Sequence, residues 1–86
     1  MYEILFSLRA VKSLKKIPKH YQVKIKDKIE ELYISARLPG TIKLVDYPVA
    51  QFRHRVSNYR ILFDIDKIEK VIEILDIRKR DEKTYR

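Results

Sequence analysis

Three arginines in the last third of the chain have the type and spacing to bind phosphate. Phe52–Val56 alternates apolar and basic residues, and Ser57-Asn58 is suited to a two-residue hairpin turn. With that turn, Arg55 faces Arg60 across the hairpin and Arg53 lies two residues along on the same face. Each guanidinium can hold two phosphate oxygens and keeps its charge. The pattern favours a phosphate-binding face; a solvated outer face with scattered arginines is the alternative.

The opposite face of this hairpin reads as core, because Phe52, His54, Ile61 and Phe63 alternate with the polar positions. A histidine between two arginines has the chemistry of a nuclease base. Strand alternation turns His54 away from the arginines, so we interpret it as a packing residue. His20, near the start of a helix, has no evident partner in the sequence. Neither histidine is excluded from catalysis.

A basic segment follows the expected last strand, with Arg78, Lys79 and Arg80 in succession and Tyr85 near the terminus. Such a run can simply be a solvated strand end. A phenol close to arginines can stack on a base or donate a hydrogen bond. The alternative role of Tyr85 is to anchor the C-terminus against the core.

The net charge of the chain also favours an anionic partner. Lys and Arg total 20 against 12 Asp and Glu, which gives a net charge of +8. Eight basic residues and one acidic residue lie between Arg9 and Lys28. Such a field favours a nucleic acid or an acidic protein partner, although a merely soluble, mixed-charge surface is the other interpretation.

Composition excludes several classes of protein and site. The 86 residues are expected to form a single domain, 1–86. The chain has no cysteine, so disulfides, thiolate metal sites and a cysteine nucleophile are excluded, and a cytoplasmic location is expected. No segment approaches the roughly 18 apolar residues of a membrane span. No cluster has metal-ligand spacing, and we expect neither a metal nor another cofactor.

The elements that position the arginines begin with a short strand over Tyr2–Phe6. Ser7 then offers a helix N-cap, and Ile17-Pro18 closes that helix. A second helix is expected from about Lys19 to Ser35, ended by Leu38-Pro39-Gly40. The apolar residues expected on one side of the helical hairpin are Leu8, Val11, Leu14, Tyr21, Ile25, Ile29 and Leu32.

Thr41–Ala50 reads as a connector, in which Pro48 limits regular pairing. The hairpin follows, and Val71–Ile77 is a largely apolar last strand. The fold class is therefore α+β: an N-terminal strand, a helical hairpin and a three-stranded antiparallel meander, with the helices packed on one face of a small antiparallel sheet.

The string YRILF, the apolar strand after it and the terminal RKRDEKTYR resemble the RelE toxins of bacterial and archaeal toxin–antitoxin modules. The opening MYEILFSLRAVKSLKKIPK is similar to that family's first strand and basic helix, so the resemblance covers essentially the whole chain. It implies a RelE-like fold. It also implies a toxin that inhibits translation as a metal-independent endoribonuclease, cutting mRNA in the decoding site of the ribosome by 2′-hydroxyl attack.

The resemblance also implies roles for individual residues. Arg60 and Arg80 would bind the scissile phosphate, and Tyr85 would orient or stack the nucleotide. Arg53 and Arg55 match two basic strand residues that are often lysine in the family, and would contact the backbone or help with proton transfer. Because arginine does not readily release a proton, their acid–base role is in doubt while their electrostatic role remains.

The partners implied are a cognate antitoxin, the ribosome with its RNA, and mRNA, with no membrane. The basic residues that would then bind RNA are Lys12, Lys15, Lys16, Lys19, Lys24, Lys28, Arg78 and Lys79. Two alternatives stay open. One is a ParE-like inhibitor of DNA gyrase from the same superfamily, and the other is a non-enzymatic RNA-binding protein or degenerate toxin.

Overall fold

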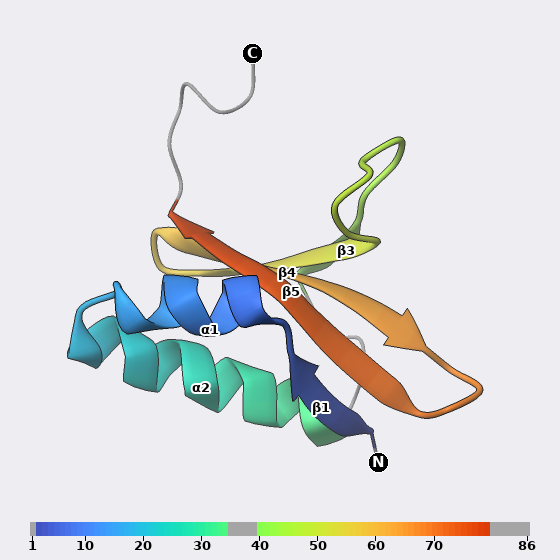
Figure 1. Cartoon of the computed structure of the whole chain (residues 1–86), viewed down its shortest axis with the longest axis horizontal. Coiled ribbons are helices and arrows are strands. Elements are labelled where there is room, and N and C mark those ends of the chain that lie inside the picture. Colours follow the sequence, from blue (N-terminus) through green and yellow to red (C-terminus); the bar gives the residue numbers. More distant parts are fainter. Residues whose placement is uncertain (1, 35–39, 80–86) are drawn as a thin grey trace.

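The computed structural model describes residues 2–34 and 40–79. Their elements follow one another as strand, two helices and four strands. The bounds are β1 Glu3–Phe6, α1 Leu8–Lys15, α2 Lys19–Ile34, β2 Thr41–Lys43, β3 Phe52–Val56, β4 Tyr59–Asp66 and β5 Val71–Lys79. The predicted order of strand, helical hairpin and meander is confirmed (Figure 1).

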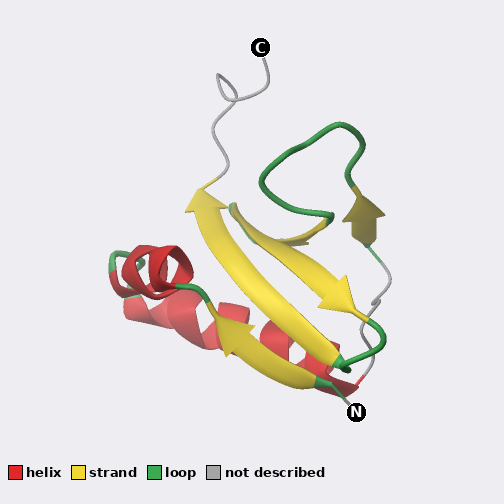
Figure 2. Cartoon of the chain, turned by 45° about the vertical axis from the view of Figure 1, so that its right-hand side comes forward, coloured by secondary structure: helices red, strands yellow, loops and turns green. Residues whose placement is uncertain are grey.

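The strands form one sheet in the order β1-β5-β4-β3-β2. The helices lie on one side of it, and the loop between β2 and β3 stands on the other (Figure 2). The predicted α+β class is confirmed with two additions, of which the first corrects the expected wholly antiparallel sheet. β1 runs parallel to β5, so the sheet is mixed: β2, β3, β4 and β5 alternate in direction, and β5 thereby has the same direction as β1 beside it.

The second addition is β2, which lies inside the segment expected to be only a connector. Thr41 pairs with His54 and Lys43 with Phe52 at the edge of the sheet. The amide of Leu44 donates to the carbonyl of Gln51, 2.8 Å away, which ends the pairing. A three-residue edge strand is too short to leave a periodic pattern in the sequence.

Local signals explain the helices. The Ser7 side chain accepts a hydrogen bond from the Ala10 amide, 3.1 Å away, so it is the N-cap that the sequence predicts. α1 ends before Ile17-Pro18, and α2 buries Ile25, Ile29 and Leu32 as expected. Of the residues in the predicted second helix, Ser35 lies outside the described part of the chain.

The expected apolar face of α1 is wrong at Leu8, which is 70% exposed, whereas Ala10 is fully buried. The reason is the position of the helix, which lies beside β5 where β1 ends. The Ser7 amide donates to Ile74 and the Ser7 hydroxyl to Leu75, at 2.9 and 2.7 Å. A small residue suits this close approach, and α1 thereby protects the edge of β5.

The core lies between the sheet and the two helices, and α2 contributes most of the helical residues. Its largest fully buried side chains are Phe63, Ile25, Leu32, Ile61, Ile72 and Ile74. Phe63 stacks on Phe52 with ring centroids 5.7 Å apart. The inward residues of β3 and β4 therefore fix one face of the hairpin and leave its other face to the arginines.

A β-bulge decides which side chains of β5 reach that outer face. Leu62 pairs with Asp76, but the next residue, Phe63, pairs with Ile74, so Leu75 is extra on β5. Strict alternation from Ile74 would turn Asp76 toward the core; the bulge turns it outward. β5 also extends to Lys79, so Arg78 and Lys79 lie within the strand that they were expected to follow.

Candidate functional site: an arginine face on the sheet

The β3–β4 hairpin has the register that the sequence predicts. Arg55 pairs with Arg60 and Arg53 with Leu62, around a turn in which Ser57 has a φ of 53°. Tyr59, next to Arg60, is buried in the core. Alternation therefore places the three arginines on the outer face, away from α2.

The structure adds a fourth arginine to this face, because Arg78 is the cross-strand neighbour of Arg60 on β5. Arg55, Arg60 and Arg78 thus form a row across three adjacent strands. The sequence predicts an RNA contact at Arg78 but contains no pattern that places it beside Arg60. The signal that could have done so is the spacing of Ile74 and Ile77 at three residues, which marks the bulge. We call Arg53, Arg55, Arg60 and Arg78 the arginine face.

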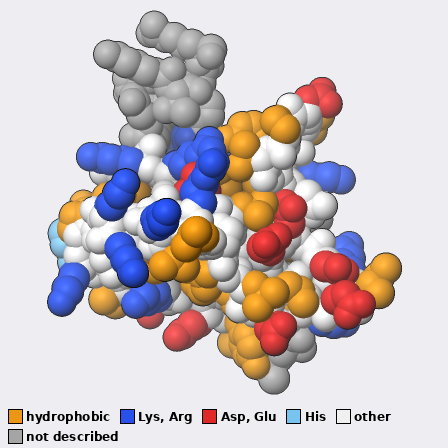
Figure 3. Space-filling model, in the orientation of Figure 1, with side chains coloured by type: hydrophobic (Ala, Val, Ile, Leu, Met, Phe, Trp, Pro, Cys, Tyr) orange, Lys and Arg blue, Asp and Glu red, His pale blue; other side chains and the backbone are white. Residues whose placement is uncertain are grey.

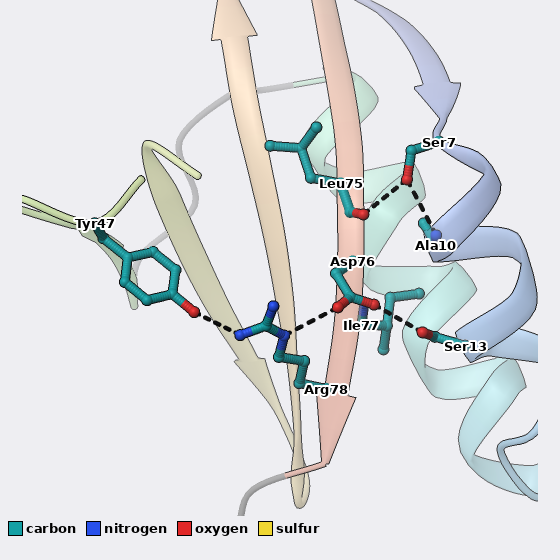
Figure 4. Close-up of polar contacts among 8 residues, drawn as sticks. All are labelled: Ser7, Ala10, Ser13, Tyr47, Leu75, Asp76, Ile77 and Arg78. Carbon is teal, nitrogen blue, oxygen red and sulfur yellow. Dashed lines mark hydrogen bonds and ion pairs between the residues drawn. The ribbon is translucent and has the colours of Figure 1, made fainter. Parts of the chain in front are cut away.

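Arg78 is held by neighbours on both sides (Figure 4). Its Nε donates to the Asp76 carboxylate at 2.9 Å, and its terminal nitrogen Nη1 donates to the Tyr47 hydroxyl at 2.7 Å. Asp76 in turn accepts from the Ser13 hydroxyl of α1 at 2.7 Å and from the Ile77 amide at 2.8 Å. The guanidinium is therefore oriented by α1, β5 and the β2–β3 loop together.

Asp76 is 5% exposed, and its charge is maintained by these contacts. Burial alone raises the pKa of Asp76, but hydrogen bonds from Ser13, Arg78 and the Ile77 amide outweigh burial, and the pKa lies below its usual value. Asp76 thus stays ionised beside Arg78 at neutral pH. Within the arginine face, Asp76 therefore offsets the charge of Arg78.

Such a face can bind a phosphodiester. Guanidinium forks match phosphate oxygens, and arginines pre-positioned by a folded sheet need no rearrangement to do so. The buried Nε of Arg53 has no hydrogen-bond partner among the residues that the structure describes.

Charge is segregated along the molecule (Figure 3). Basic side chains gather over α1 and the end of β5, whereas acidic side chains gather toward the β4–β5 turn. On the outer face Asp64 pairs directly with Glu73, and Asp66 and Glu69 follow in the turn. These acids also line an open groove together with Leu5 and Tyr47. A polyanion is therefore attracted to the arginine end and repelled from the other.

The lysines of the predicted RNA contact do not all adjoin the arginine face. Lys12 and Lys15 lie on α1, which is linked to the face through Ser13 and Asp76. Lys24 and Lys28 lie on α2, which covers the opposite face of the sheet, and Lys28 forms an ion pair with Glu31 at 3.2 Å. The remaining predicted contacts at the helix junction and the end of β5 are exposed: Lys16, Lys19 and Lys79.

The two histidines lie apart from the arginine face. His54 is 5% exposed and faces the helices, and its Nδ1 is 3.1 Å from the Thr41 hydroxyl. Burial lowers the pKa of His54 below its ordinary value of 6.5, Lys28 lowers it further, and Glu31 acts in the opposite direction. His20 is exposed at the start of α2, with its ring 4.1 Å from that of Tyr21. The packing interpretation of His54 agrees with this geometry.

His54 gives a prediction for stability against pH. Because the pKa of His54 is depressed in the folded state, the unfolded chain binds this proton more readily. Stability is therefore complete above about pH 6.5 and falls as pH drops toward the folded-state pKa, by at most about 1.4 kcal/mol per pH unit. Urea unfolding between pH 8 and 5.5 measures it. His54→Gln should flatten the profile and His20→Gln should not; an unchanged slope in His54→Gln contradicts the assignment.

Two residues that the family resemblance assigns to the site, Arg80 and Tyr85, lie outside the described residues. Within 2–34 and 40–79, no group of three or more His, Asp or Glu side chains could hold a metal ion. Neither described helix is long and apolar enough to cross a membrane.

Comparison with known proteins agrees with the fold. The sequence model of the family described as ParE toxin of type II toxin–antitoxin system, parDE, matches residues 4–84. Solved structures match as well. The RelE chain of a RelB–RelE antitoxin–toxin complex from Methanococcus jannaschii is 30% identical with a TM-score of 0.71, covering 87% of this chain and 88% of that chain.

An archaeal RelE–RelB complex from Pyrococcus horikoshii matches at 25% identity and a TM-score of 0.80, covering 94% of this chain and 97% of that chain. The RelBE2 toxin–antitoxin complex from Mycobacterium tuberculosis matches at 24% identity and a TM-score of 0.80, covering 92% and 98%, which shows the fold. No curated protein sequence matches the chain.

Proposed function

Since the chain belongs to the ParE toxin family of type II toxin–antitoxin systems, within the RelE/ParE superfamily, we propose that it is a ribosome-dependent mRNA endonuclease. It would cut mRNA in the decoding site and so inhibit translation. The observation that carries the proposal is the arginine face, in which Arg55, Arg60 and Arg78 are adjacent across three strands. Like charges opposite one another destabilise a sheet. A bound phosphate would neutralise this repulsion between the arginines.

The proposed reaction is an internal transfer at one phosphate. The ribose 2′-oxygen attacks the adjacent phosphorus and loses its proton, while the bond from phosphorus to the 5′-oxygen breaks and that oxygen takes up a proton. The products are a 2′,3′-cyclic phosphate and a 5′-hydroxyl. Negative charge builds on the phosphate oxygens in the transition state, and arginines fixed beside them stabilise it more than they stabilise the substrate.

Arg60, at the centre of the row, is assigned to the scissile phosphate together with Arg80, and Tyr85 to the neighbouring nucleotide. Arg53 and Arg55 are assigned to electrostatic contacts with the RNA backbone, because a guanidinium is a poor general acid. The proton transfers would then be made by groups of the RNA, the ribosome or water. No cofactor is needed for these steps.

The partners follow from the same proposal. Several of the solved structures that match this chain are complexes of RelE with RelB, which supports a cognate antitoxin for it. We propose that the antitoxin neutralises the arginine face with an acidic or amphipathic segment. Lysines on α1 and at the helix junction would contact ribosomal RNA, and such contacts weaken steeply with salt. The action on ribosomes implies a cytoplasmic location.

The test is to add the purified protein to ribosomes programmed with a defined mRNA and to look for shortened mRNA. Cleavage that requires ribosomes supports the proposal. A chain that leaves mRNA intact at all times, with ribosomes and without them, overturns it.

The match to the ParE family model favours one second candidate, inhibition of DNA gyrase. Such an inhibitor binds a protein target and has no need of an arginine row on an open face. A supercoiling assay separates the two: inhibition of gyrase without mRNA cuts would establish the alternative.

A further inference from the structure

We propose that Tyr47 and Arg78 act together as an additional nucleotide contact, in which Arg78 binds a backbone phosphate and the Tyr47 ring stacks on a base. The inference deepens the proposed function, since it concerns RNA on the same face. It concerns two residues outside the set of arginines and tyrosine that the family resemblance assigns to catalysis.

The first observation is the position of Tyr47. It comes from the loop between β2 and β3, yet its hydroxyl lies 2.7 Å from Arg78 on β5 (Figure 4). The loop therefore reaches over the outer face as far as the arginine row. The side chain remains 38% exposed, so a large part of the ring is available to a ligand. An aromatic ring at the edge of a cationic surface is the usual platform for a nucleic-acid base.

The second observation is the fixed orientation of Arg78. Its Nε is bound to Asp76, and Asp76 is held by Ser13 and by the Ile77 amide. A guanidinium has five donors, and the described contacts of Arg78 use two of them. A phosphate can therefore bind without displacing Asp76 or Tyr47. Asp76 is a positioning residue, because it acts on RNA only through Arg78.

The third observation is local charge. Arg78 adjoins Arg60, so a phosphate at Arg78 would belong to the same strand of RNA as the phosphate at Arg60. The acidic end of the outer face, with Asp64 opposite Glu73, repels the RNA backbone from the other direction. A single-stranded RNA would therefore run along the arginine row with one base against Tyr47.

The experiment measures the affinity of a labelled five-nucleotide single-stranded RNA, and of the same ribose-phosphate backbone without bases, by fluorescence anisotropy. Tyr47→Ala should weaken binding of the base-bearing RNA about tenfold and weaken binding of the abasic backbone much less, since only the hydrogen bond to Arg78 is lost there. Tyr47→Phe should keep most of the affinity. Tyr33→Ala is the matched control, because Tyr33 is 40% exposed on α2, on the opposite side of the sheet.

Arg78 is tested by the salt dependence of the same binding. Arg78→Ala should reduce the slope of log affinity against log salt by about 0.7, the contribution of one phosphate contact on a single strand. Arg78→Lys should preserve the slope, and Arg9→Ala, an exposed arginine on α1, should leave it unchanged. Asp76→Asn should lower affinity in Arg78-bearing protein and have no further effect in Arg78→Ala.

Equal losses on both RNAs in Tyr47→Ala, or no RNA binding by the wild type at low salt, would overturn the inference. So would an unchanged slope in Arg78→Ala. The two assays separate the Tyr47–Arg78 contact from the proposed endonuclease activity. Ribosome-dependent cleavage with no effect of Tyr47→Ala leaves the nuclease standing, whereas base-dependent binding without any cleavage leaves the contact and removes the nuclease.

Discussion

Replacing Arg60 with alanine is expected to lower the rate of ribosome-dependent mRNA cleavage by about a hundredfold to a thousandfold. Arg60 lies at the centre of the arginine row, with Arg55 opposite it on β3 and Arg78 opposite it on β5. It is therefore the arginine of the row that has a neighbouring arginine on each side. The measurement is the initial rate of cleavage at saturating ribosome-bound mRNA.

Arg60→Lys should recover part of the rate, because it restores the charge without the two-pronged geometry. Arg9→Ala should cleave at the wild-type rate, since Arg9 is exposed on α1 and is not part of the arginine face. Thermal unfolding of each variant separates lost chemistry from lost structure. Wild-type cleavage by a folded Arg60→Ala protein would remove Arg60 from the site.

The largest expected effect on stability is that of Phe63→Ala, about 3–5 kcal/mol. Phe63 is fully buried, stacks on Phe52 and pairs with Ile74 next to the bulge. A domain of this length has a total stability of roughly 4–13 kcal/mol. The variant should therefore be close to unfolding, and the arginine face would be lost with the sheet. Urea denaturation followed by circular dichroism measures the change.

Val45→Ala is the matched control for this truncation, because Val45 is an apolar residue of the β2–β3 loop that is 80% exposed. Its stability should stay within about 0.5 kcal/mol of the wild type. A loss of less than about 1 kcal/mol in Phe63→Ala would contradict the position of Phe63 at the centre of the core.

Those features of the fold that depend on a regular period were predictable from the sequence. The alternation through β3 and β4 gave the hairpin, its turn and the pairing of Arg55 with Arg60, all of which the structure confirms. Helix start and stop signals at Ser7 and Pro18 were equally local. What could not be predicted depends on tertiary contacts. Leu8 lies on an apolar helical face, yet α1 meets only the edge of β5 and leaves Leu8 exposed.

The bulge at Leu75 is a feature of the site that could not be predicted from the sequence. The apolar run of β5 hides a change of register, because Leu75, Asp76 and Ile77 break the alternation by one residue. Only pairing with β4 reveals that Asp76 and Arg78 turn outward. The contact from Tyr47 was equally hidden, since it joins residues 31 positions apart across an irregular loop. Three arginines of the face were therefore predictable, and the group that holds the fourth was not.

Primer extension on ribosome-bound mRNA shows whether this protein cuts mRNA in the decoding site and whether Arg60 is required. Wild-type protein, Arg60→Ala and Arg9→Ala are each added to free mRNA and to ribosomes stalled at a defined codon, and the new 5′ ends are mapped. We expect cuts within the decoding-site codon, only with ribosomes, made by the wild type and Arg9→Ala but not by Arg60→Ala. Identical cleavage by Arg60→Ala, or no cuts by the wild type, would contradict this expectation.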